Sequence, residues 1–134
     1  MSSEPDHRGR DEVTDLLARY GSLLDRGDHA AWVDLFTAEG SFEVLGRSFQ
    51  GREGLMGMAE TAPGGVHMAG LPVIELDGDS AEVQQSFVFI DQHSHEVRIG
   101  WYDDVMRRED GRWRFERRRA TFLTAEGPSD RPEG

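Results

Sequence analysis

The sequence predicts an α+β domain in which a cone-shaped, curved antiparallel sheet wraps around N-terminal helices and encloses an internal pocket. Apolar residues recur at three- to four-residue spacing early in the chain and at every second position later. Short turn sequences that contain glycine separate the later segments. A chain with helices first and an antiparallel meander afterwards gathers its helices on one side of the sheet.

Two longer helices and one short helix are expected in the first 60 residues. The first helix begins near Asp11 and ends at Gly27, because glycine accepts the left-handed conformation found at helix ends. Asp28 is a suitable N-cap for a second helix, which carries Trp32, Leu35 and Phe36. Residues 51–60 form a short third helix, although three glycines weaken it.

The period-two alternation predicts the strands that follow. They span residues 42–49, 66–76, 81–91, 97–108 and 112–124. Gly46 is expected to bend the first strand. Pro72 interrupts the second, because proline has no N–H to donate. Asp77-Gly78-Asp79 and Glu109-Asp110-Gly111 are predicted to be tight hairpin turns.

Length and composition indicate one domain over residues 11–124, flanked by disordered tails at 1–10 and 125–134 that are rich in small and charged residues. The net charge of −11 argues against binding to nucleic acid or to an anionic membrane. The polar stretch Met1–Arg10 does not look like a secretory signal, and cysteine is absent, so we expect a cytoplasmic protein. The arginines between 107 and 119 are interpreted as an exposed hairpin balanced by nearby acids.

Four stretches carry a family resemblance: "LLARYGSLLDRGDHAAWVDLFTAEGSFE", "GREGL", "VHMAGLPVIELDGDSAEV" and "GWYDDVMRREDGRWRFERR". Together they resemble the SnoaL-like branch of the nuclear transport factor 2 superfamily over about residues 12–123. Members include polyketide cyclases, scytalone dehydratase, bile-acid dehydratases, ketosteroid isomerases, epoxide hydrolases and non-catalytic binding modules. The resemblance implies the fold but does not choose among these activities.

The resemblance to the dehydratases implies a catalytic set of His67, Asp25 and Tyr20. In those relatives the aspartate orients and charges the histidine, which moves the proton. Imidazole suits this task because it both takes and gives a proton near neutral pH. Each residue also has a structural interpretation: His67 as a satisfied core histidine, Asp25 as a solvated residue off the apolar stripe of the first helix, and Tyr20 as a core aromatic. The chain departs from these relatives at Val44, Phe89 and Phe122, which leaves the substrate open.

Six residues are predicted to bind substrate. Strand alternation puts Gln85, Phe87 and Phe89 on one face, and the family pattern directs Tyr102 inward. Trp32 and Met56 complete the predicted pocket wall. Asp103 and Asp104 are interpreted as a solvated strand edge.

No metal site or organic cofactor is expected. His93 and His95 could share a ligand face, but they lie near a hairpin tip without a clear third ligand.

These features favour a cofactor-free lyase or isomerase, a dehydratase or cyclase, that acts on a small hydrophobic polyketide- or steroid-like molecule. One alternative is a non-catalytic binding or assembly module of the same fold. Another is an epoxide hydrolase, for which Arg98 would have to face the cavity with two acids such as Asp25 and Asp103. We also expect a homodimer, formed through the outer sheet face that carries Val97, Ile99, Trp101 and Val105.

Overall fold

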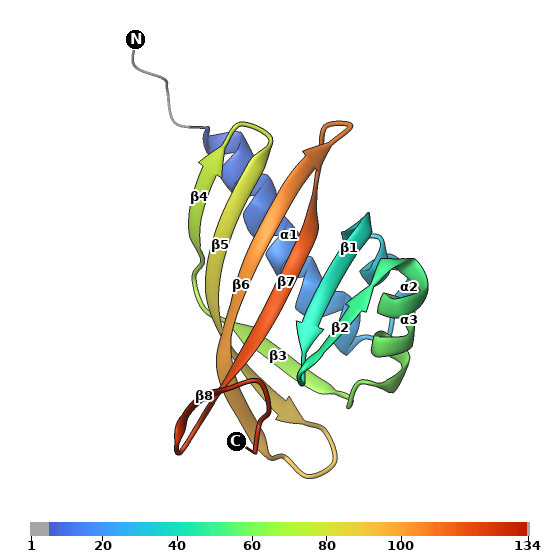
Figure 1. The fold of residues 1–134 in the computed structure, drawn as a ribbon, viewed down its shortest axis with the longest axis vertical. Coiled ribbons are helices and arrows are strands. Elements are labelled where there is room, and N and C mark those ends of the chain that lie inside the picture. Colours follow the sequence, from blue (N-terminus) through green and yellow to red (C-terminus); the bar gives the residue numbers. More distant parts are fainter. Residues whose placement is uncertain (1–5, 134) are drawn as a thin grey trace.

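The computed structural model describes residues 6–133 and shows helices packed against a large curved sheet (Figure 1). The helices are α1 (His7–Asp25), α2 (His29–Val33) and α3 (Gly51–Thr61). The strands are β1 (Phe36–Val44), β2 (Arg47–Gln50), β3 (Gly65–Ala69), β4 (Val73–Asp77), β5 (Ser80–Asp91), β6 (Val97–Glu109), β7 (Arg112–Thr124) and β8 (Gly127–Ser129). The α+β prediction with N-terminal helices is therefore confirmed.

The ordered elements extend beyond the predicted domain limits of 11 and 124. Helix α1 starts at His7, where the Asp6 carboxylate accepts a hydrogen bond from the Gly9 N–H at 2.7 Å. Arg10 donates to the backbone oxygen of Ile74 at 3.1 Å, and β8 pairs with β7. Residues 7–10 and 127–129, predicted to lie in tails, thus belong to the helix and the sheet. Residues 1–5 and 134 lie outside the described part.

The sheet is mixed, not purely antiparallel as predicted. Its strand order is β2-β1-β7-β6-β5-β3, with β4 also pairing with β5 and β8 with β7, and β1 runs parallel to β7. The predicted strand over 42–49 is a hairpin that turns at Leu45 and Gly46, both with positive φ. Phe36, predicted to be helical, starts β1. Alternation reports which side chains share a face, but it does not report strand direction, so β1 could not be oriented from the sequence.

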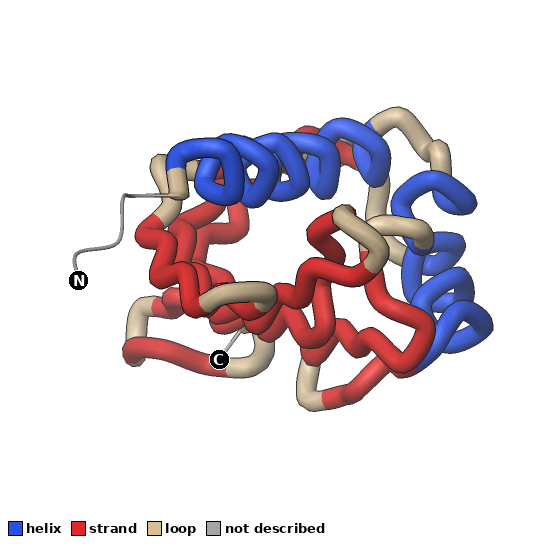
Figure 2. The backbone as a smooth tube through the Cα atoms, turned by 90° about the horizontal axis from the view of Figure 1, so that it is seen from above, coloured by secondary structure: helices blue, strands red, loops and turns tan. Residues whose placement is uncertain are grey.

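The interruption at Pro72 shapes the sheet as expected. It separates β3 from β4, and these two strands pair with opposite ends of β5. Helix α1 crosses the concave side of the sheet, while α2 and α3 close one end (Figure 2). The predicted apolar stripe of α1 is buried against the sheet through Val13, Leu16, Leu17 and Tyr20. The side chains between helix and sheet form the core and surround the cavity described below.

None of the helices between residues 6 and 133 has both the length and the apolar character required to cross a bilayer.

At Gly100 the backbone of β6 lies tightly against that of β7. A Cβ atom at this position would overlap the backbone oxygen of Thr121. Since two paired backbones cannot separate without breaking their hydrogen bonds, glycine is required here.

We expect Gly100→Ala to lower the free energy of unfolding by about 2 kcal/mol or more, because overpacking between paired strands is not relieved by a rotamer change. Gly57→Ala is the matched control: Gly57 lies on the exposed side of α3 with open space around its Cβ position. Its replacement should raise stability by about 0.5–1 kcal/mol through the helix propensity of alanine. Urea unfolding of both variants measures the two effects, and equal effects would contradict this explanation.

Candidate active site

The structure brings His67 and Asp25 into direct contact. The imidazole Nδ1 lies 2.5 Å from Asp25 Oδ1, and the backbone N–H of His67 donates to Asp25 Oδ2 at 2.8 Å. The two side chains are 17% and 16% exposed, so water is largely excluded from the contact. One carboxylate therefore holds both the backbone and the ring of His67.

The end of α1 makes this contact possible. Asp25 is the last residue of α1, and Gly21 lies one turn before it. A Cβ atom at Gly21 would lie 3.3 Å from the Cβ of His67, so the small residue lets β3 pass close to the helix. Asp25 lies off the apolar stripe of α1, as the helical spacing indicated, but β3 runs past this end of the helix and meets it there.

The contact fixes the tautomer of His67. A carboxylate only accepts hydrogen bonds, so Nδ1 carries the proton and donates it to Asp25. Nε2 is then the basic atom of the ring, and it has no hydrogen-bond partner among residues 6–133. This arrangement of carboxylate, Nδ1–H and free Nε2 is that of a general base in nucleophilic and acid–base enzymes.

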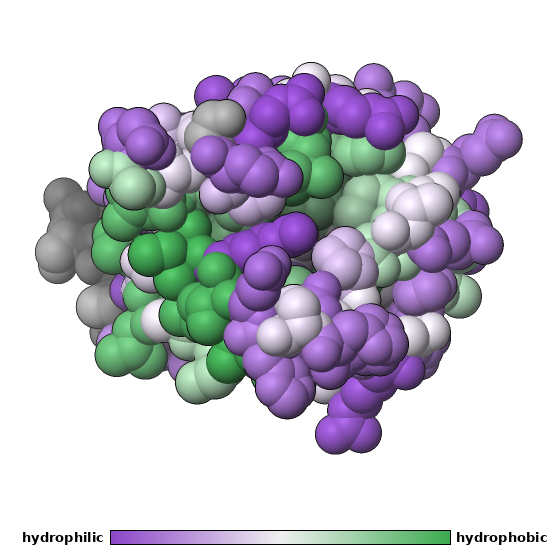
Figure 3. Space-filling model, turned by 90° about the horizontal axis from the view of Figure 1, so that it is seen from below, coloured by the Kyte–Doolittle hydropathy of each residue, from purple (hydrophilic) through white to green (hydrophobic). Residues whose placement is uncertain are grey.

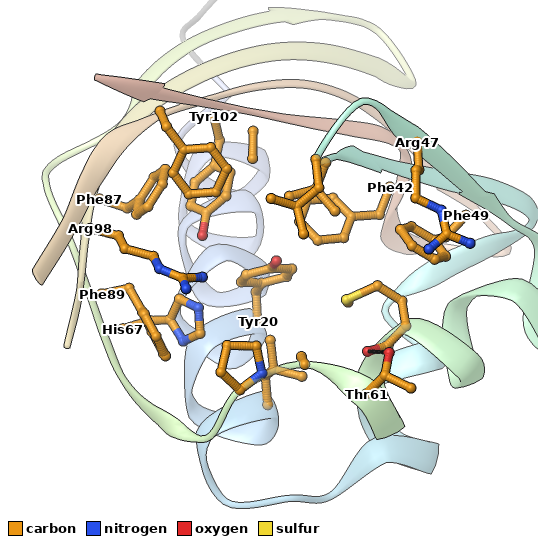
Figure 4. A pocket seen from close by; sticks show the side chains of 18 residues that line it. Tyr20, Phe42, Arg47, Phe49, Thr61, His67, Phe87, Phe89, Arg98 and Tyr102 are labelled. Carbon is orange, nitrogen blue, oxygen red and sulfur yellow. Dashed lines mark hydrogen bonds between the residues drawn. The ribbon is translucent and has the colours of Figure 1, made fainter. Parts of the chain in front are cut away.

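The His67 ring lies on the wall of a cavity of about 180 Å³, called here the central cavity (Figure 4). Its wall is largely apolar and comes from both helices and strands. The lining residues are Tyr20, Leu24, Phe42, Val44, Leu45, Arg47, Phe49, Met58, Thr61, Ala62, Pro63, His67, Phe87, Phe89, Arg98, Tyr102, Ala120 and Phe122. Seen from below, the molecule is hollowed near the middle of this face, with apolar surface gathered on one side (Figure 3).

Tyr20 and Tyr102 bring hydroxyl groups into this apolar cavity (Figure 4). Their ring centroids lie 5.6 Å apart, and Tyr20 is also edge-on to His67 at 6.3 Å. Burial raises the pKa of Tyr20 well above its usual value and that of Tyr102 to about 12. Both hydroxyls are therefore protonated at neutral pH and can donate a hydrogen bond to a ligand.

A buried ion pair supports the two tyrosines from behind. Arg118, which is fully buried, lies 3.2 Å from Asp104, and its guanidinium stacks 3.5 Å from the Tyr102 centroid and 4.1 Å from that of Tyr20. The Arg118 Nε–H does not hydrogen-bond to the nearby carboxylate, but Nη2 donates to Gln85 Oε1 at 3.2 Å. The guanidinium fixes the position of both rings.

These two charged residues were not identified from the sequence. Arg118 was predicted to lie in an exposed arginine hairpin, and Asp104 on a solvated edge. The structure buries both, because Arg118 shares the inward strand face of Ala120 and Phe122, and Asp104 shares that of Tyr102. Their direct cross-strand register is the signal that could have paired them.

Three predicted pocket residues do not line the central cavity. Trp32 is fully buried beneath it, with its ring 5.7 Å from that of Tyr20. Gln85 lines a second pocket together with Asp25, His67 and Arg118, where its amide donates to the backbone oxygen of Gly70 at 2.9 Å and accepts from Arg118. Met56 is half-buried on α3, and its neighbour Met58 faces the cavity instead. Tyr102, Phe87 and Phe89 line the central cavity.

The epoxide-hydrolase arrangement is not formed. Arg98 lines the central cavity, but no Asp or Glu of the described residues does. Asp25 faces the far side of the His67 ring. Asp103 alternates with Tyr102 along β6 and so lies on the opposite face of the sheet.

The SnoaL-like domain model matches residues 6–119. The chain belongs to the SnoaL-like family. This confirms the resemblance on which the catalytic assignment rests, and it leaves the activity of this SnoaL-like chain to be decided by its site. A comparison with curated proteins gives no match.

Solved structures agree with this family and its fold. Rv3472 from Mycobacterium tuberculosis, a protein of unknown function, is 29% identical with a TM-score of 0.76, over 83% of this chain and 69% of that one. An NTF2-like protein with a cystatin-like fold from Novosphingobium aromaticivorans is 27% identical with a TM-score of 0.78. The match covers 88% of this chain and 85% of that one. A protein of the same organism, described as a putative scytalone dehydratase, is 19% identical with a TM-score of 0.77, over 92% of this chain and 87% of that one. This likeness shows the fold alone.

The buried pair predicts a pH dependence of stability. Burial raises the pKa of Asp104 to about 6, although the charge of Arg118 opposes this, whereas an unfolded aspartate has a pKa of about 3.9. A carboxyl group whose pKa is raised by folding stabilises the protein while protonated, and this contribution is lost as the pH rises through the folded value.

We therefore expect the stability of Asp104→Asn, which mimics the protonated acid, to rise relative to the original protein as the pH goes from about 4 to about 7, on top of a constant loss from removing the counter-charge of Arg118. This rise reaches up to about 3 kcal/mol, since each pKa unit corresponds to about 1.4 kcal/mol. Chemical unfolding at several pH values measures it, with Asp103→Asn as the control. If Asp104→Asn instead loses stability relative to the original protein as the pH rises over this range, the charge of Arg118 outweighs burial and lowers the pKa of Asp104.

Proposed function

We propose that the protein is a cofactor-free lyase or isomerase, a dehydratase or cyclase, in which the His67–Asp25 pair removes a proton from a small, largely apolar carbonyl compound. The observation that carries this proposal is the hydrogen-bonded imidazole–carboxylate pair on the wall of an apolar cavity. A structural histidine would need a single backbone partner and would not have to present its free nitrogen to a cavity.

In the dehydratase reaction, Nε2 of His67 takes a proton from the carbon next to the substrate carbonyl. The C–H electron pair forms an enolate, and the hydroxyl of Tyr20 or Tyr102 donates a hydrogen bond to its oxygen. The enolate then expels the β-hydroxyl group, which receives the proton from the imidazolium and leaves as water. Asp25 stabilises the imidazolium between these two steps.

The surroundings strengthen each polar contact. The phenylalanines of β1, β5 and β7 exclude water from the cavity, and a hydrogen bond to a developing charge is stronger at low dielectric. A positioned general base contributes about 10²–10⁴-fold, so the tyrosine hydroxyls and the fixed geometry must supply the remainder.

The size of the cavity narrows the substrate class. About 180 Å³ is below the roughly 300–1,000 Å³ of pockets that take drug-sized ligands. This favours a compact polyketide-like molecule of one or two rings over a steroid. The dehydratases that the family includes are consistent with chemistry of this kind.

We expect His67→Ala to lower kcat by about 10²–10⁴-fold on a β-hydroxy ketone that the original protein dehydrates, because the base is removed. Asp25→Asn should lose at least about 10²-fold, since an amide stabilises the imidazolium less than a carboxylate does. Turnover of a panel of β-hydroxy ketones, followed by enone absorbance, measures both. His93→Ala, a change at an exposed histidine, is the control and should keep full activity.

Two outcomes would contradict the catalytic proposal. In the first, the panel binds but none of its members is converted, which would make the protein a binding module. In the second, turnover survives in His67→Ala. Circular dichroism of each variant separates a lost base from a lost fold.

We also propose a homodimer formed through the outer face of the sheet. Exposed apolar side chains lie there on three strands: Val66 and Met68 on β3, Val97 and Ile99 on β6, and Leu123 on β7, with β5 between β3 and β6. Trp101 and Val105, on the same face of β6, are half-buried. An apolar face of this kind is typical of a protein interface.

Sedimentation velocity should give about twice the 15.1 kDa mass of one chain. Ile99→Lys places a charge in the middle of the face and should shift the protein to the monomer, whereas Glu60→Lys, at an exposed position of helix α3 and not on the sheet, should not. A monomer before any substitution would rule the dimer out.

A further inference from the structure

Arg98 introduces a cation into the apolar central cavity. It lies near the start of β6, is half-buried, and its side chain points into the cavity from the same wall as His67 and Phe89 (Figure 4). The cross-strand register places the three residues in one row, with Phe89 paired to His67 on one side and to Arg98 on the other. The guanidinium and the proposed base therefore face the same ligand.

Within the described residues, Arg98 has no acidic partner. It forms no ion pair, and the lining of the central cavity includes no Asp or Glu. The other arginine on this wall, Arg47, is exposed and stacks on Phe49 at 5.1 Å. A partly desolvated guanidinium without a counter-charge is unfavourable, so the protein bears a cost that a bound anion would remove.

The basic character of the cavity wall contrasts with the acidic composition of the chain. The chain carries 26 acidic against 15 basic side chains, yet the cavity wall holds basic side chains and no acidic ones from the described part. Guanidinium binds a carboxylate through two parallel N–H donors, which gives both affinity and orientation. A carboxylate held there would place its neighbouring carbons in front of Phe89 and His67.

We propose that the central cavity takes a small apolar carboxylic acid whose carboxylate is bound by Arg98. This names the substrate class of the proposed active site and rests on that assignment for its location. The apolar part of the acid lies among the phenylalanines of the wall, the carboxylate at Arg98, and the reacting carbon between it and Nε2 of His67.

The test uses binding without turnover, with trans-cinnamate and its neutral isostere trans-cinnamamide as the probes. Isothermal titration calorimetry at neutral pH should show that cinnamate binds at least about 10-fold more tightly than cinnamamide, because a charge-assisted bidentate contact is stronger than a neutral one. In Arg98→Gln the preference for cinnamate should vanish while the affinity for cinnamamide is unchanged. Arg98→Lys should restore part of it, since lysine keeps the charge but not the two-donor geometry.

Two further variants locate the effect. Arg47→Gln should keep most of the preference, because Arg47 lies exposed at the mouth. His67→Ala should keep it too, so a protein that prefers cinnamate but converts no substrate would retain this inference and lose the proposed function. Conversely, a catalytically active protein that does not discriminate between the two probes would lose this inference alone.

Equal affinity of the two probes, a preference that survives in Arg98→Gln, or a preference that disappears in Arg47→Gln but not in Arg98→Gln would overturn the assignment. The absence of measurable binding of either probe at millimolar concentration would also count against it. Thermal unfolding of each variant confirms that a lost preference does not reflect a lost fold.

Discussion

The site depends on one contact, between the last residue of α1 and the third residue of β3. Asp25 accepts the backbone N–H and the ring N–H of His67 at once, so a single carboxylate joins the end of the helix to the edge of the sheet and fixes the base. A hydrogen bond to a charged group is worth about 1.5–3 kcal/mol, more than a neutral one. The positions of α1 and β3 and the orientation of the His67 ring thus depend on one another, so the fold itself places the base.

The two tyrosines next to this contact are held by a different interaction. The Arg118 guanidinium lies against both tyrosine rings, and cation–π contact in a desolvated site contributes about 2 kcal/mol. Asp104 balances its charge, and Gln85 Oε1 accepts a hydrogen bond from its Nη2. Because a buried ion pair often gives little net stability, its main effect here is to fix where the two hydroxyls lie. Fixed donors need no reorganisation when charge develops on a ligand.

Much of this arrangement follows from the pattern of residues. The stripe of α1, the break at Pro72 and the inward face of β5 were predicted because each depends on local spacing. The parallel pairing of β1 with β7 was missed, since direction is set by the path of the chain through space. Asp25 illustrates the same limit. Its position on the helical wheel indicated solvent, and the strand that covers it begins 40 residues later.

Arg118 and Arg98 show where sequence reasoning fails and what the structure adds. Both are arginines on alternating strands, but Arg118 was predicted to lie in an exposed hairpin, and Arg98 to face the cavity only if the protein were an epoxide hydrolase. Arg118 is fully buried, and its Nε lies 3.2 Å from Asp104 Oδ1 on the neighbouring strand, so its charge is compensated within the fold. Arg98 is half-buried in the cavity, and no acidic group of residues 6–133 reaches it. Since an uncompensated charge lowers stability, we attribute that of Arg98 to the proposed ligand and that of Arg118 to the architecture of the sheet. Arg118 and Arg98 differ in whether an acidic side chain lies beside them, and only the folded chain brings such partners together.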